Sequence, residues 1–255
     1  MTILVLNCGS SSIKYQVFDF TSGCEMLAKG LIERIGLNDG IFTHKPSGKD
    51  PYKITCDIPD HTIGIDMVIK ALTDPVHGVI TNINEIMAVG HRVVQGGEKF
   101  QESVLIDEDV KKAIEIYCEL APLHNPANLK GILSVEKVMP GVPQVAVFDT
   151  SFHQTMPDHA FMYAIPYEFY EKYKIRKYGY HGTSHKFVAN KAAKILGKDI
   201  AKLRIITCHL GNGSSMAAIL NGVSIDTSMG FTCRRTGGMG TRTGEIVGSA
   251  SLSCR

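Results

Sequence analysis

The feature that most constrains this chain is a short polar turn that occurs twice, each time between two apolar runs. The first copy reads NCGSSS at residues 7–12, and the second reads GNGSS at residues 211–215. Asn, Gly and Ser tolerate the backbone angles of a tight turn, and such a turn gathers N–H groups and hydroxyls at one point, which suits a phosphate. Two copies, each joining strand to strand, predict a duplicated domain with a phosphate held between the halves.

Composition narrows the classes of protein that remain. A net charge of +2 over 255 residues is too small to indicate a nucleic-acid or anionic-membrane partner. The first residues have no basic leader and turn polar too soon, so we expect no signal peptide there, and no apolar stretch approaches the ~20 residues that span a bilayer. Seven cysteines are scattered without CxxC spacing, which argues against a disulfide framework or a zinc site. We therefore expect a cytoplasmic globular protein.

Hydrophobic periodicity predicts an α/β architecture in two related lobes. The pattern starts with a hairpin over 3–20 and restarts near residue 204, with Asn221-Gly222 as a second hairpin turn. The first lobe is expected over 1–149, and residues 150–255 form a second lobe that is too short to repeat the first. Further elements are expected as helices over 62–72, 107–120, 125–139 and 185–196, and as strands over 86–94 (interrupted at 90–92), 144–148 and 203–208.

Two of the predicted helices carry recognisable end signals. Asn125 is expected to cap the helix over 125–139, with Pro126 in its first turn. Ser184 is expected to cap the helix over 185–196, and Gly197 to end it.

Several polar residues are candidates for phosphate chemistry, each with an ordinary structural alternative. Lys14 follows the first turn and can place a charge on a phosphate, or it is simply an exposed lysine; no Walker A sequence occurs. Arg92 lies between glycines, where it is either a bidentate clamp for an anion or a surface charge. Arg242 lies in a Gly-rich loop and could reach a transferring phosphoryl group.

Acidic and histidine side chains complete the set. Asp149 ends a strand, where it is a Mg²⁺ or water ligand, an acid/base group, or a simple turn cap. His181 and His185 have a spacing that can hold zinc, but no HExxH is present, so His181 is better interpreted as a donor at the mouth of a site. His209 stands at the rim of the second turn, which is otherwise an ordinary β-turn.

Six stretches in this order resemble the acetate kinase family, with the related propionate and butyrate kinases. They are LNCGSSSIK at 6–14, GHRVV at 90–94, FDTSFH at 148–153, YGYHGTSH at 178–185, HLGNGSS at 209–215 and DTSMGFT at 226–232. The resemblance implies a duplicated fold of the actin, Hsp70 and sugar-kinase (ribonuclease H-like) kind. It also implies reversible transfer of the ATP γ-phosphoryl group to acetate with Mg²⁺, in a homodimer.

The resemblance also assigns roles to individual positions. Asn7 would lie near Mg²⁺ and Lys14 near the nucleotide phosphates, and Arg92 would bind the acetate carboxylate. Asp149 stands at the family's acid/base position, although acetate is already deprotonated near neutral pH and needs no base. The catalytic pair His181 and Arg242 would stabilise the transition state. Phosphate contacts are implied for His209, Leu210, Gly211, Asn212 and Gly213, and contacts with the substrate methyl for Val94, Leu123 and Tyr180.

The sequence also departs from the family pattern. Gln95 stands where family members usually have His, and Cys233 stands where Pro is expected. From residue 233 the match weakens, and the rest of the family's second lobe, with an adenosine-binding motif and a Mg²⁺-binding Glu, is missing, so we expect a truncated or misread product. Two alternatives therefore stay open: a propionate or butyrate kinase, and an inactive chain that only binds nucleotide.

Overall fold

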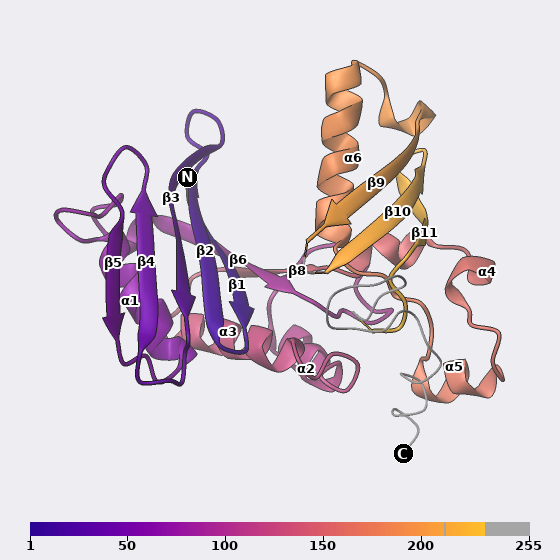
Figure 1. Cartoon of the computed structure of the whole chain (residues 1–255), viewed down its shortest axis with the longest axis horizontal. Coiled ribbons are helices and arrows are strands. Elements are labelled where there is room, and N and C mark those ends of the chain that lie inside the picture. The colour runs from indigo at the N-terminus through magenta and orange to yellow at the C-terminus, as the bar shows by residue number, and fades with distance from the viewer. Residues whose placement is uncertain (212, 233–255) are drawn as a thin grey trace. The chain divides into compact units, whose positions relative to one another are not determined.

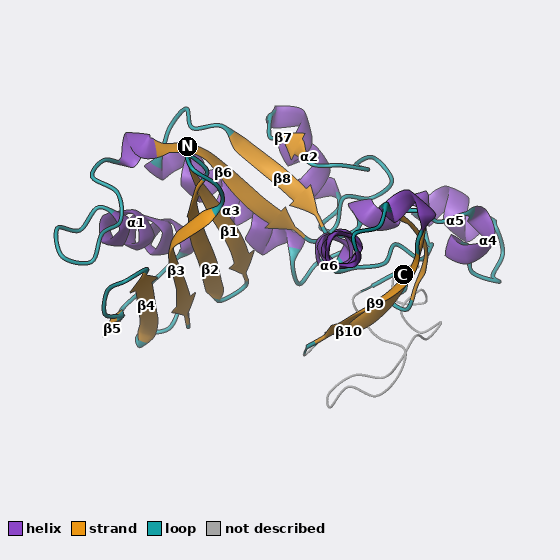
Figure 2. Ribbon diagram, turned by 90° about the horizontal axis from the view of Figure 1, so that it is seen from above, coloured by secondary structure: helices purple, strands orange, loops and turns teal. Residues whose placement is uncertain are grey.

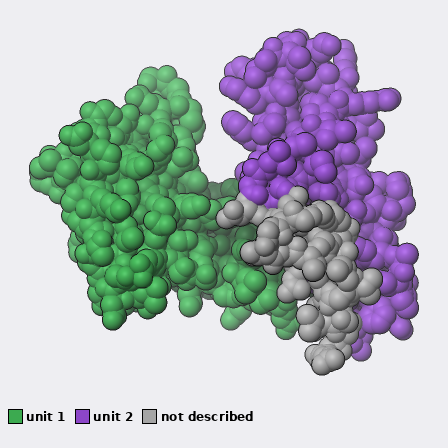
Figure 3. Space-filling model, in the orientation of Figure 1, with its two compact units in different colours: residues 1–94, 103–147 green, residues 95–102, 148–255 purple. Residues whose placement is uncertain are grey.

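The chain, described by a computed structural model over residues 1–211 and 213–232, divides into two compact units. Unit 1 comprises residues 1–94 and 103–147, and unit 2 comprises residues 95–102 and 148–255 (Figure 3). The main division therefore falls at 147/148, and a short excursion over 95–102 belongs to the second unit. No helix in the described part of the chain is both long and apolar enough to cross a bilayer.

Unit 1 is built on a mixed sheet of eight strands in the order β5-β4-β3-β2-β1-β6-β8-β7 (Figure 1). Strands β1 to β5 form an antiparallel meander, while β6 joins β1 in parallel. The strands are β1 Thr2–Gly9, β2 Ser12–Asp19, β3 Glu25–Glu33, β4 Gly40–Pro46, β5 Tyr52–Cys56, β6 Ile86–Val93, β7 Val104–Leu105 and β8 Gln144–Phe148.

Strict alternation along the first hairpin decides which face of the sheet is covered. Leu4, Leu6 and Cys8 of β1 are buried, while Val5 is exposed and Asn7 half-buried. The buried face packs against helices α1 (His61–Leu72) and α3 (Asn125–Val138), which also contact each other (Figure 2). The opposite face is partly exposed and carries both polar and apolar side chains, among them Asn7, Lys14 and Val5. A shorter helix, α2 (Glu108–Ile116), packs on α3, and a single 3-10 turn, Ile83–Glu85, precedes β6.

Unit 2 contains a second antiparallel sheet in the order β11-β10-β9. A small apolar core of Ala189, Ala217 and Ile219 lies between this sheet and helix α6. The elements are η2 Ser151–Thr155, α4 Asp158–Phe161, α5 Glu168–Tyr173, α6 Gly182–Leu196, η3 Ile200–Lys202, β9 Arg204–Leu210, β10 Ser214–Leu220 and β11 Val223–Thr227.

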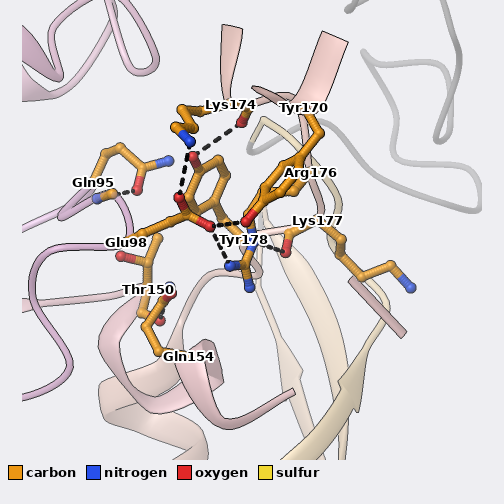
Figure 4. Close-up of polar contacts among 10 residues, drawn as sticks. Gln95, Glu98, Thr150, Gln154, Tyr170, Lys174, Arg176, Lys177 and Tyr178 are labelled. Atoms are coloured by element: carbon orange, nitrogen blue, oxygen red, sulfur yellow. Dashed lines mark hydrogen bonds and ion pairs between the residues drawn. The ribbon is translucent and has the colours of Figure 1, made fainter. Parts of the chain in front are cut away.

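Residues 95–102 are attached to unit 2 by an ion-pair network around Glu98 (Figure 4). The Glu98 carboxylate accepts hydrogen bonds from Arg176 Nη1 and Tyr170 Oη, each at 2.8 Å. Although partial burial alone would raise it, these bonds hold the pKa of Glu98 below its ordinary value. The Arg176 guanidinium lies 3.6 Å from the centre of the Phe161 ring and is almost fully buried. The attachment therefore pairs a buried guanidinium with a partly exposed carboxylate.

Both predicted hairpins are confirmed. Residues 2–9 pair with 12–19 across the first polar turn, and residues 204–210 pair with 214–220 across the second. The turn at Asn221-Gly222 has positive φ at both residues, the geometry that selects this dipeptide. The helix over 62–72 is also confirmed as α1, with Asp60 capping it through a bond to the Ile63 N–H.

Four local expectations are wrong, and for three of them tertiary contacts override the local signal. Strand β6 is not interrupted at 90–92, because Gly90 and His91 continue the parallel pairing with β1. The helix predicted over 107–120 ends at 116. Asn125 does not cap α3: it lies inside the helix, and its buried amide donates to the Ile114 carbonyl. Ser184 does not cap α6, which begins two residues earlier, because its hydroxyl bonds His209 instead.

Candidate active site

The site residues of unit 1 lie on the face of its sheet that the helices α1 and α3 leave uncovered. Asn7 of β1 stands directly across from Lys14 of β2. Arg92 reaches Asn7 from β6, with its Nη1 donating to Asn7 Oδ1 at 3.2 Å. Asn7 and Lys14 also line a hollow of about 610 Å³ on this face. Three adjacent strands thus bring together a fork of N–H donors, an amide oxygen and an exposed ammonium, and this combination suits an anion.

Asn128 of α3 holds the ends of β1 and β6 in place. Its Oδ1 accepts from the Val94 N–H at 3.0 Å, and its Nδ2 donates to the Cys8 carbonyl at 2.8 Å. Both partners adjoin site positions, and Asn128 is 3% exposed, so the two bonds are shielded from water. Asn128 therefore fixes the backbone next to Asn7 and near Arg92, although sequence reasoning did not select it.

Cys8 is the closest thiol to this region, and it is a packing residue. It is buried against α3 at Gly131, where a Cβ atom would meet its sulfur at 2.5 Å. Burial raises the pKa of Cys8 to about 12, so the thiolate form is suppressed. Cys208, near the second polar turn, is by contrast exposed.

The residues predicted to surround a substrate methyl have different environments. Val94 and Tyr180 are buried, at 2% and 1% exposure, whereas Leu123 is 71% exposed in unit 1. The Tyr180 hydroxyl donates to the Phe231 carbonyl at 2.8 Å and accepts from Gln95 Nε2 at 3.3 Å. Gln95, which replaces the histidine usual in the family, is therefore a hydrogen-bond donor to a predicted site residue within unit 2.

Asp149 directly follows β8 and is almost fully buried. Its carbonyl accepts from the Gly182 N–H at 2.8 Å, which ties the end of β8 to the start of α6. A Cβ atom at Gly182 would overlap that same carbonyl oxygen. Glycine is therefore required at 182 to bring the Asp149 backbone next to His181.

His181 and His209 form the centre of the unit 2 site. His181 caps α6 in the left-handed region with φ of 58°, an uncommon conformation for a residue other than glycine. The rings of His181 and His209 stack at 4.1 Å between centroids, and a Cβ atom at Gly213 would lie 3.2 Å from His181 Nε2. Two imidazoles thus border the second polar turn, where Leu210 and Gly211 are exposed. Asn212 and Arg242 lie outside the described residues.

The sequence matches the Acetokinase family over residues 2–251. It is also 59% identical, over 246 residues, to the acetate kinase of Thermoanaerobacter pseudethanolicus, an alignment that covers 96% of this chain. The chain belongs to the acetokinase family. The resemblance inferred from six motifs is thereby confirmed, and the match runs beyond residue 232, where the motifs placed its end.

Solved structures of acetokinase relatives confirm the fold class. The crystal structure of Porphyromonas gingivalis acetate kinase matches with a TM-score of 0.90 at 46% identity, and that of a Francisella tularensis propionate kinase with a TM-score of 0.88 at 44% identity. Each comparison covers 98% of this chain and 63% of the other. The chain likewise spans 61% of the Thermoanaerobacter acetate kinase.

Sequence reasoning did not select the buried residues that hold the site residues in place by hydrogen bonds. Asn128, Ser215 and His185 are buried polar residues whose partners lie 22 to 120 positions away. The available signal was weak: a polar residue on the buried stripe of a predicted helix, as for Asn128 and His185. A buried polar group needs a partner, so such positions indicate a network even when its members cannot be named.

Proposed function

We propose that the whole protein is an acetate kinase, which transfers the γ-phosphoryl group of ATP to acetate and forms acetyl phosphate and ADP. The observation that carries the proposal is the 59% identity to an acetate kinase, together with the Arg92–Asn7 contact beside Lys14. An acetate oxygen forms a bond to the γ-phosphorus while the bond to the β-phosphate oxygen breaks. No proton has to be moved, because acetate is ionised near neutral pH.

Each unit contributes groups suited to anionic substrates. In unit 1, Arg92 would bind the acetate carboxylate through its donor fork, and Lys14 would place a charge on the ATP phosphates. In unit 2, His209 and residues 210–213 would hold phosphate oxygens, and His181 would donate to charge that develops in the transition state. Arg242 would add to that stabilisation. Val94, Leu123 and Tyr180 would limit the length of the acyl group.

The proposal includes Mg²⁺ as the partner of ATP. Asn7 offers an amide oxygen whose second lone pair is available beside its bond to Arg92, and Asp149 offers a carboxylate. Hard oxygen ligands of this kind fit an ion that takes one or two protein ligands and completes its shell with phosphate and water. When bound, Mg²⁺ would neutralise phosphate charge and orient the γ-phosphate. Asp149 is therefore assigned to the metal or its water network rather than to proton abstraction.

The test is formation of acyl phosphate by the chain as it stands. Incubation with ATP, Mg²⁺, acetate and hydroxylamine should give acetyl hydroxamate and ADP in equal amounts. Arg92→Ala should raise the acetate KM, and Arg92→Lys should restore it only in part because lysine lacks the fork. Lys53→Ala, which removes a charge from β5 of the same sheet, outside both the family motifs and the hollow, is the matched control. Nucleotide binding without hydroxamate would favour the alternative of an inactive nucleotide-binding chain.

A propionate kinase is the second candidate, favoured by the Francisella tularensis structure. One methylene changes binding by only ~1–3 kcal/mol, so kcat/KM must be compared for acetate, propionate and butyrate in one series. The highest value is expected for acetate.

We also infer a cytoplasmic homodimer from the family resemblance. Light scattering on the eluted protein should then give twice the mass of the chain.

A further inference from the structure

Four histidines of unit 2 form a cluster whose arrangement the proposed reaction does not explain. His153 and His185 are fully or almost fully buried, and the His185 ring lies edge-on to those of His153 and His209, at 5.7 and 6.4 Å. Within residues 1–211 and 213–232, no group of three or more His, Cys, Asp or Glu side chains is placed to hold a metal ion. Each histidine instead contacts a hydroxyl group, so the cluster is organised by Ser and Thr.

One chain of hydrogen bonds within the cluster leads from the core to the site. Thr207 Oγ1 lies 2.7 Å from His185 Nδ1, and His185 Nε2 lies 2.8 Å from Ser215 Oγ. Ser215 Oγ lies 2.9 Å from His181 Nδ1. Thr207, His185 and Ser215 are each at most 4% exposed, so solvent cannot replace any of these bonds. Every contact must therefore have one donor and one acceptor.

Two arrangements remain once the Ser215 O–H must also have an acceptor, because its hydrogen-bond partners among the described residues are His181 and His185. A neutral imidazole has one N–H, and a hydroxyl has one O–H but can accept as well. In the first arrangement, Thr207 donates to His185 Nδ1, His185 Nε2–H donates to Ser215, and Ser215 donates to His181 Nδ1. In the second, every bond is reversed, so that His181 Nδ1–H donates and the Thr207 hydroxyl only accepts. The two arrangements predict opposite tautomers of His181.

The buried end of the chain selects the first arrangement. When reversed, the Thr207 O–H would need an acceptor, and in the described part of the protein His185 is the hydroxyl's one hydrogen-bond partner. A buried donor without a partner costs about 1–3 kcal/mol, which is a factor of roughly 5 to 150 in population. The first arrangement satisfies every hydrogen. It requires His185 to be neutral, and burial, with a smaller contribution from His209, lowers the pKa of His185 to about 4. Among the described residues, Asp149 also acts on both His185 and His153, and His181 acts on His153.

We propose that Thr207, His185 and Ser215 are positioning residues that fix His181 as the Nε2–H tautomer. The Nε2 atom points toward the second polar turn, since a Cβ atom at Gly213 would lie 3.2 Å from it. The bond from Ser215, together with the left-handed backbone at His181, holds this N–H on the side where an anion would bind. The nature of the anion, a nucleotide phosphate, rests on the proposed function; the tautomer does not.

Histidine tautomers can be measured directly on the 255-residue chain without substrate. Long-range ¹H–¹⁵N spectra of protein labelled at histidine distinguish the protonated ring nitrogen from the unprotonated one, and His181→Gln assigns the signals. At neutral pH we expect an unprotonated Nδ1 and a protonated Nε2 at His181. A protonated Nδ1 in the wild-type protein would overturn the proposal, whatever the variants show.

Three variants test whether the hydroxyl chain sets the tautomer. Ser215→Ala should move the two ¹⁵N shifts of His181 toward each other, because the ring is then free to exchange tautomers, and Ser215→Thr should restore them. Ser224→Ala is the matched control, because it removes the hydroxyl 2.8 Å from His153 Nδ1 and leaves the His181 contacts intact. Unchanged His181 shifts in a folded Ser215→Ala protein would refute the role of Ser215. A chain that forms no acetyl phosphate would count against the proposed function alone.

Discussion

Replacing His91 with glutamine is expected to make the fold less sensitive to acid. The His91 ring is 2% exposed, and its Nε2–H donates to Gln144 Oε1 at 2.7 Å. Burial lowers the pKa of His91 from its ordinary 6.5 to about 4, because the imidazolium would be poorly solvated there. In the unfolded chain the pKa of His91 returns to its ordinary value, so the folded and unfolded states bind different numbers of protons at a pH between the two pKa values.

The sign and size of the effect follow from these two pKa values. Between pH 6.5 and 4 the unfolded state binds more protons than the folded state. The free energy of unfolding therefore has its full value above pH 6.5, as far as this ring is concerned, and falls as the pH is lowered toward 4. For this one ring, the free energy of unfolding should fall by about 1.8 kcal/mol between pH 7 and pH 5. That is a large share of the 5–15 kcal/mol that stabilises a typical protein.

Urea unfolding followed by far-UV circular dichroism provides the measurement, since the sequence contains no Trp for fluorescence. Wild type and His91→Gln are compared at pH 7 and pH 5, so that the contributions of all other groups cancel. His159→Gln, at an exposed histidine, is the matched control and should behave as wild type. Equal losses of stability in wild type and His91→Gln would refute the reasoning.

Three further outcomes are expected. Gly182→Ala should lower the free energy of unfolding in urea by about 1–3 kcal/mol, because the added methyl group overlaps a backbone carbonyl. Gly90→Ala is the control and should not have that cost, because its added Cβ meets no atom within 4 Å. Asn128→Ala should cost about 2–4 kcal/mol in the same assay, because two buried backbone groups lose their partner. Native Cys8 should resist a thiol reagent that labels the exposed Cys208, as peptide mass spectrometry can show; equal labelling would contradict its burial.

The elements that sequence reasoning predicted well depend on local signals. The two hairpins around the polar turns follow from alternating burial and from residues that tolerate tight turns. Helix α1 begins at a side-chain cap and keeps its apolar spacing to the last turn. The strand order of unit 1 was not predictable. Strand β6 pairs with β1 although some eighty residues separate them, and no local sequence signal identifies either strand as the partner of the other.

The candidate site was predictable through its motifs and not through its supporting contacts. Arg92 and Asn7 were each selected, but their direct contact depends on the parallel register of β1 and β6. The prediction that Ser184 caps a helix was wrong for a similar reason. A serine before a helical pattern usually caps it, and only the fold shows that His209 takes its hydroxyl.

The excursion of residues 95–102 restricts how this polypeptide can be dissected. A fragment cut at the 149/150 boundary would leave Glu98 on the wrong piece, so the Arg176 guanidinium would sit between Phe161 and the interior without its counter-ion. Because Arg176 is almost fully buried, losing its carboxylate leaves a buried charge uncompensated, which should destabilise a small isolated piece. The C-terminal portion can be studied separately only if the octapeptide is supplied with it, either grafted to its end or added in trans.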